Sequence, residues 1–93
     1  MNISLFWSSN LRKDSETFNH WRHRRISLST FHEATLLSHV KAGNTVQLYT
    51  YQNFDESVPI PPEIIVEDGH QYFPAEDAFS ALKRGHSIAH ISD

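Results

Sequence analysis

The sequence predicts a small α/β fold, in which a mainly parallel sheet is flanked by helices. Apolar runs at residues 3–7 and 46–51 have the composition of buried strands. Between them, residues 30–42 have the spacing of an amphipathic helix. A strand, a helix and a second strand in this order form a crossover unit, and such units normally build parallel sheets.

The length of 93 residues allows one domain at most, here residues 1–93, and so short a chain buries a modest share of its surface. Hydrophobic residues make up 39% of the chain and charged residues 20%, which is typical of a globular protein rather than a disordered one.

The first strand is expected at residues 3–7, before the polar sequence Ser8-Ser9-Asn10, so Trp7 at its carboxyl end would face a cleft. The following residues 12–27 are polar and charge-dense. Phe18, Trp21 and Ile26 interrupt them without a clear period, and a loop and a short helix both remain open.

The central helix has start and stop signals. Thr30 and Glu33 have the spacing of a capping box, and Gly43 suits the residue that ends a helix. The residues between them place one apolar stripe on the helix: Phe31, Ala34, Leu36, Leu37 and Val40.

The second half of the chain predicts two strands and a helix. Residues 46–51 alternate in strand fashion, three of the four prolines lie in residues 58–62, and a short strand is expected at residues 63–67. Pro74 then marks the start of a helix that ends before Gly85, with Glu76 and Asp77 in its first turn.

The charge balance limits the classes of partner. A formal net charge of −3 gives no general attraction to nucleic acid, and we expect no nucleic-acid partner. No apolar stretch approaches the ~20 residues of a membrane-spanning helix. The chain contains no cysteine and no signal-peptide pattern, so a cytoplasmic location is expected.

The order of these elements, with Trp7 ending the first strand and Leu48-Tyr49-Thr50-Tyr51 in the second, resembles a known family. It is similar to the start of the GT-A glycosyltransferases that share an Asp-x-Asp motif, including capsular polysaccharide enzymes and glucosylating toxins. The resemblance covers most of the chain outside residues 8–27. It implies the first, Rossmann-like half of a nucleotide-binding domain.

The resemblance also implies a ligand and its contacts. Trp7 and Tyr51 would lie near the base of a nucleotide sugar, and Asp93 near its ribose or donor sugar. A divalent cation, Mn²⁺ or Mg²⁺, is implied only for a full-length relative, because no Asp-x-Asp occurs here and no cofactor is expected within this chain. The chain is therefore expected to be a truncated domain, inactive alone.

Residues 8–27 are longer than the corresponding loop of that family, and we expect them to reshape or cover the base pocket. Other interpretations of the aromatic residues stay open. Trp7 at the end of a strand is equally well explained by core packing, and Tyr49 and Tyr51 share a strand face on which they would pack together.

Two groups of polar residues can be interpreted either as ordinary surface residues or as functional ones. His86 and His90 have the helical spacing of a metal pair, but no further ligand lies near them in the sequence. Residues 20–25 are basic and include an aromatic side chain, so they could bind phosphates or single-stranded nucleic acid, whereas a solvated loop face is the favoured interpretation in an acidic chain.

A second function class is a non-catalytic interaction module. An open sheet edge would favour a homo-oligomer, or a partner chain that completes the sheet. This hypothesis predicts association that is indifferent to nucleotide.

Overall fold

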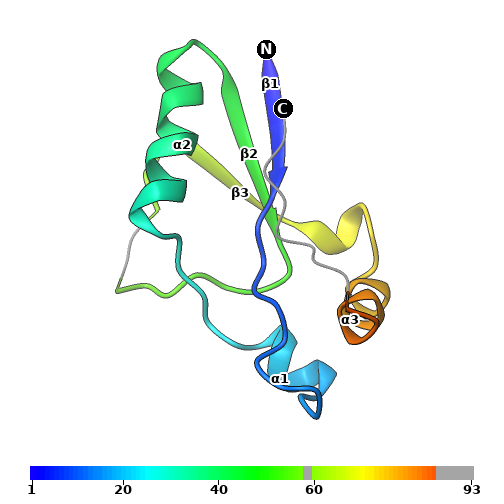
Figure 1. The fold of residues 1–93 in the computed structure, drawn as a ribbon. Coiled ribbons are helices and arrows are strands. Elements are labelled where there is room, and N and C mark those ends of the chain that lie inside the picture. Colours follow the sequence, from blue (N-terminus) through cyan, green and yellow to red (C-terminus); the bar gives the residue numbers. More distant parts are fainter. Residues whose placement is uncertain (58–59, 86–93) are drawn as a thin grey trace.

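A computed structural model of the chain describes residues 1–57 and 60–85. Its centre is a three-stranded parallel sheet in the order β1-β2-β3, made of Asn2–Phe6, Thr45–Thr50 and Ile64–Asp68 (Figure 1). Leu5 pairs with Leu48, and Leu48 with Val66. The expected small α/β fold with a parallel sheet is confirmed, and each strand begins and ends within one residue of its predicted bounds.

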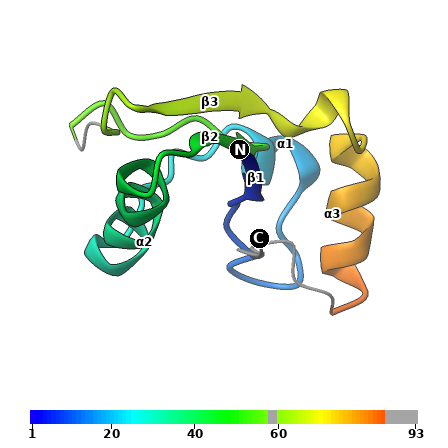
Figure 2. The same ribbon diagram turned by 90° about the horizontal axis from the view of Figure 1, so that it is seen from above.

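Helices cover both faces of the sheet. The long helix α2 (Thr30–Lys41) lies on one face and α3 (Ala75–Lys83) on the other, as two perpendicular views show (Figures 1 and 2). The short helix α1 (Phe18–Arg22) lies beyond the carboxyl ends of the strands, and a single 3₁₀ turn, η1 (Gly69–Gln71), follows β3. Helices on both faces are the usual arrangement for parallel strands.

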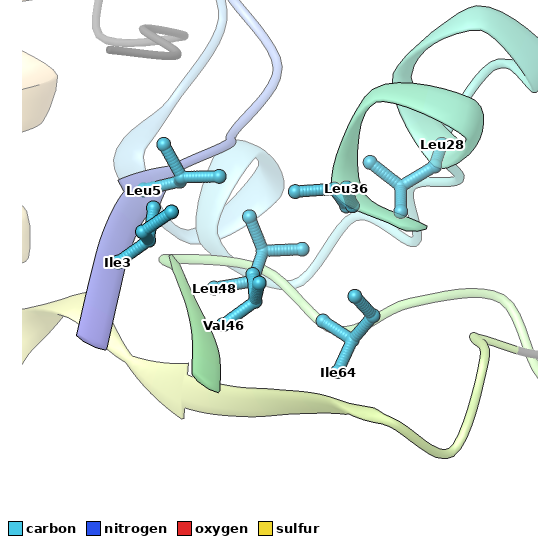
Figure 3. Close-up of a cluster of buried hydrophobic side chains, with 7 residues drawn as sticks. All are labelled: Ile3, Leu5, Leu28, Leu36, Val46, Leu48 and Ile64. Carbon is cyan, nitrogen blue, oxygen red and sulfur yellow. The ribbon is translucent and has the colours of Figure 1, made fainter. Parts of the chain in front are cut away.

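The core between the sheet and α2 is aliphatic. Alternate residues of β1 and β2, together with Ile64 of β3, point toward Leu36 of α2, which is completely buried (Figure 3). The buried residues of this core are Ile3, Leu5, Leu28, Leu36, Val46, Leu48 and Ile64.

The core on the other face is largely aromatic. Trp21 of α1 packs between Tyr51, just after β2, and Phe79 of α3, with ring centroids 5.9 and 5.6 Å apart. Ala75, Ala78 and Leu82 form the buried side of α3. Residues that follow β1 and β2 thus build the second core together with α1 and α3.

The start of α2 differs from the sequence prediction. Ser29, not Thr30, is the N-cap, and its hydroxyl accepts a hydrogen bond from the His32 N–H. Its apolar stripe is also narrower than expected: Leu36 is buried, whereas Phe31 is 76% exposed. The helix begins one residue earlier because Ser29 occupies the extended conformation that an N-cap needs.

No helix in the described part of the chain is both long enough and apolar enough to cross a membrane.

Candidate functional site

Residues 8–27 fold across the carboxyl ends of β1 and β2. The Ser8 hydroxyl lies 3.1 Å from that of Thr50 and accepts a hydrogen bond from the Tyr51 N–H. Further on, Ile26 and Phe54 form a parallel bridge. Both ends of the segment are therefore fixed to the sheet and to the chain that follows it.

Trp21 anchors the middle of this segment. It is fully buried, and its indole N–H donates to the Ser9 carbonyl at 2.8 Å. The Gln52 side-chain amide donates to the Ser9 hydroxyl and to the Trp21 carbonyl, both at 2.8 Å. A buried indole with its N–H paired is a strong packing element, and here it seats α1 on the sheet.

A buried ion pair completes the segment. The carboxylate of Glu16 has no exposed area and accepts from Arg24 Nη1 at 2.8 Å, from the Arg12 backbone N–H at 2.9 Å, and lies 2.9 Å from His20 Nδ1. Burial alone raises the pKa of Glu16, but the Arg12 N–H, Arg24 and His20 together lower it below its usual value. Glu16 is therefore a carboxylate at neutral pH.

The first hollow at this end of the molecule, the Trp7 pocket, has a volume of about 260 Å³. It is lined by Trp7, Ser9, Asn10, Arg12, Arg24, Arg25, Ile26 and Ser27. Three arginines and a tryptophan thus line one small hollow, although they come from separate parts of the sequence.

The arginines of the Trp7 pocket differ in how they are held. Arg24 Nη2 donates to the Ser9 hydroxyl at 2.6 Å and to the Asn10 carbonyl at 2.7 Å, in addition to its pairing with Glu16. Arg25 lies 4.0 Å from the exposed Glu56 carboxylate. The guanidinium of Arg24 is therefore held rigidly, and Glu16 balances its charge. The guanidinium of Arg25 is only weakly paired, at the surface.

The structure places Trp7 just beyond β1, half-buried. Its backbone N–H donates to the Tyr49 carbonyl at 2.9 Å, and its ring centroid lies 4.1 Å from that of His32. Trp7 packs against the aliphatic core, as one of its two interpretations expects, and it also lines the Trp7 pocket.

Tyr51 lies in a different environment. Its ring packs near Phe6 and Trp21, and its hydroxyl donates to the Phe73 carbonyl at 2.8 Å. Only 3% of the residue is exposed. Burial and the nearby Asp68 carboxylate raise its pKa despite the counteracting charge of Arg22. Tyr51 lines another hollow, so the structure does not bring it and Trp7 into one site.

That other hollow, the β2–β3 hollow, lies at the carboxyl ends of β2 and β3 and has a volume of about 340 Å³. Its lining comprises Arg22, His23, Thr50, Tyr51, Gln52, Asn53, Phe54, Val66, Glu67 and Asp68. Arg22 donates to the Tyr51 carbonyl and forms an ion pair of 3.2 Å with Asp68.

The Arg22–Asp68 pair has a defined electrostatic state. Burial raises the pKa of Asp68, but hydrogen bonding from the His70 N–H and the charge of Arg22 lower it by more. Asp68 also caps η1 through the His70 N–H at 2.9 Å. An ionised carboxylate is thus held at the end of β3.

The two hollows have separate linings but share a wall. Ser9 lines the Trp7 pocket and Gln52 the β2–β3 hollow, and their side chains are hydrogen-bonded at 2.8 Å. The bridge between Ile26 and Phe54 separates the hollows in the same way.

The remaining predicted site residues lie outside the described part of the chain. These are Asp93 and the pair His86 and His90. Within residues 1–57 and 60–85, no three His, Asp or Glu side chains gather so that they could hold a metal ion.

A comparison with protein-family models, with curated proteins and with solved structures finds no match for this chain. A function related to that of the GT-A glycosyltransferases is therefore a proposal, based on the residues of this chain.

The interpretation of residues 22–25 as a solvated loop face is wrong for two of the four. Arg24 is 9% exposed and paired with Glu16, and Arg22 is tied to Asp68. The only sequence signal for the Arg24–Glu16 pair was a glutamate eight residues before Arg24, too far for a helical pair.

Proposed function

We propose that the chain binds an anionic nucleotide of the nucleotide-sugar class in the Trp7 pocket. One observation carries the proposal: Trp7 lines a small hollow together with Arg12, Arg24 and Arg25. An aromatic face suits a base, and guanidinium groups suit a diphosphate.

The position of the pocket supports the same conclusion. Ligands of open α/β sheets bind in crevices outside the carboxyl ends of the strands, and Trp7 follows the carboxyl end of β1 directly. The rigid Arg24 would position the ligand and the exposed Arg12 and Arg25 would supply most of the unbalanced positive charge. The proposal covers binding only, because the sequence contains no Asp-x-Asp to hold a metal for sugar transfer.

The test is a ¹⁵N NMR titration of the whole chain with UDP and UDP-glucose, with and without Mn²⁺. We expect saturable shifts at Trp7, Ser9 and Arg25. Trp7→Ala should weaken binding about tenfold or more, because stacking of a base on an aromatic ring is worth about 1–3 kcal/mol. A greater affinity for UDP-glucose than for UDP would identify the sugar as part of the ligand.

A second variant separates binding from folding, since Trp7 also packs against the aliphatic core. Arg25→Gln alters an exposed side chain of the pocket and should weaken binding several-fold without loss of stability. The matched control is Arg84→Gln, an exposed arginine after α3 that does not line the pocket. No saturable shift at millimolar nucleotide, or an equal effect of both arginine variants, contradicts the proposal.

A second candidate function is association through the open edge of β3. Within the described residues, β3 pairs with β2 on one side and with no strand on the other. Its Ile65 and Val66 are 41% and 43% exposed. An unpaired edge with exposed aliphatic side chains favours pairing with another strand.

A further inference from the structure

The β2–β3 hollow differs in charge from the Trp7 pocket. Its one guanidinium, on Arg22, is neutralised by Asp68 at 3.2 Å, and Glu67 adds a second carboxylate. The hollow therefore has no surplus positive charge with which to bind a phosphate or a carboxylate. A ligand that fills it is therefore not an anion.

Its polar lining has hydrogen-bonding capacity to spare. Neither the His23 imidazole nor the Asn53 carboxamide has a side-chain hydrogen bond to a described residue, and the Asp68 oxygens retain lone pairs beyond those used by Arg22 and His70. The carboxamide can both donate and accept, and the imidazole adds a further hydrogen-bonding group. A ligand rich in hydroxyl groups matches this mixture, because each hydroxyl also does both.

Two residues of the lining are apolar. Phe54 is half-buried against the aliphatic core, and Val66 is 43% exposed beside it in the lining. A hollow lined by both polar and apolar side chains suits a ring that has hydroxyls on its edge and C–H groups on its face. Its volume of about 340 Å³ is at the small end of ligand pockets.

The charged residues of the lining are also largely held in place before any ligand binds. Arg22 is fixed at both the Tyr51 carbonyl and Asp68, and Asp68 is fixed by the His70 N–H. Groups that are already held in place lose little conformational entropy when a ligand binds.

We propose that the β2–β3 hollow is a second binding site, which takes a neutral polyhydroxylated ligand of the size of a monosaccharide. Asp68 and Asn53 would hydrogen-bond its hydroxyls, and Phe54 and Val66 would pack on its C–H face. The site does not depend on the proposed nucleotide function, because the two hollows share no lining residue.

The test is a ¹⁵N NMR titration of the whole chain with glucose, galactose, N-acetylglucosamine and myo-inositol. We expect saturable shifts at Asn53, Phe54 and Glu67 for at least one of them, with a Kd on the order of 1 mM, as for a small ligand held by few contacts. The backbone signals of Trp7 and Arg25 should not move.

Two variants assign the site. Asp68→Asn keeps the size of the side chain and its ability to cap η1, but removes the charge, and should weaken binding about tenfold. Asn53→Ala should weaken it several-fold without loss of stability, because this exposed residue pairs with Ile26 through its backbone carbonyl. The matched control is Asn19→Ala, on the exposed side of α1, which should leave binding unchanged.

The outcomes distinguish this proposal from the nucleotide proposal. Saturable polyol shifts at the β2–β3 hollow that Asn53→Ala weakens support it, whatever UDP does at Trp7. Absence of saturable shifts for the whole panel overturns it, as does saturable binding of inorganic phosphate or acetate in this hollow instead of a polyol. Equal losses in Asn53→Ala and Asn19→Ala also overturn it.

Discussion

Glu16 holds together the segment that covers the carboxyl ends of β1 and β2. Its buried carboxylate joins the Arg12 backbone, His20 and Arg24, and Arg24 in turn binds Ser9 and Asn10. Glu16 lines neither hollow, yet it fixes a guanidinium that lines the Trp7 pocket. Loss of this carboxylate would leave Arg24 buried without its counter-ion.

Glu16→Gln is therefore expected to lower the free energy of unfolding by about 3 kcal/mol, since breaking a buried pair leaves an uncompensated charge. Urea denaturation followed by circular dichroism measures it. Glu63→Gln, an exposed glutamate just before β3, is the control and should change stability by less than about 0.5 kcal/mol. Equal losses in the two variants would show that the pair is not stabilising.

The same variant has a defined pH signature. The pKa of Glu16 in the folded chain lies below its usual value of 4.5, so its contribution to stability is complete above that pH and is lost as the pH falls toward the folded pKa. Glu16→Gln should therefore be less sensitive than the wild type to acid below about pH 4.5. Parallel stability curves for the two chains would contradict this assignment.

For the helices and strands, the sequence predicts those elements whose formation depends on the local pattern of apolar and polar residues. The strands and α3 follow from their apolar periodicity, and Trp7 could be placed at a strand end for the same reason. Residues 12–27 could not be assigned, because α1 is stabilised by contacts distant in the sequence, such as that of Trp21 with Phe79. The Trp7 pocket could not be predicted from the sequence either, because its arginines belong to this unassigned segment.

The N-terminus of α2 allows a test, because Ser29 and Thr30 are adjacent hydroxyl residues and either could be the N-cap. Ser29→Ala removes the hydrogen bond from the His32 N–H and should cost about 1 kcal/mol of stability. Thr30→Ala, one residue inside the helix, should cost less than about 0.5 kcal/mol. Urea denaturation of both variants decides between them, and a larger loss for Thr30→Ala would restore the capping box that the sequence suggested.

For the whole molecule, the arrangement of acidic groups on β3 limits how two copies could pair. An antiparallel pair of β3 strands centred on Val66 would place Ile65 opposite Glu67, and Ile64 opposite Asp68. No carboxylate would then face another, so acidic residues do not prevent this register. A register shifted so that Glu67 faces Glu67 would be repulsive.

We therefore expect the mass measured by size-exclusion chromatography with light scattering to rise from monomer toward dimer as the concentration increases. Ile65→Lys should keep the chain monomeric, because a lysine on an exposed strand edge opposes pairing. Phe31→Lys is the matched control, since Phe31 is 76% exposed on α2 and lies outside β3. If the wild type remains a monomer at every concentration, the β3 edge does not mediate self-association. If Phe31→Lys alone abolishes the dimer, the exposed side of α2 is the contact instead.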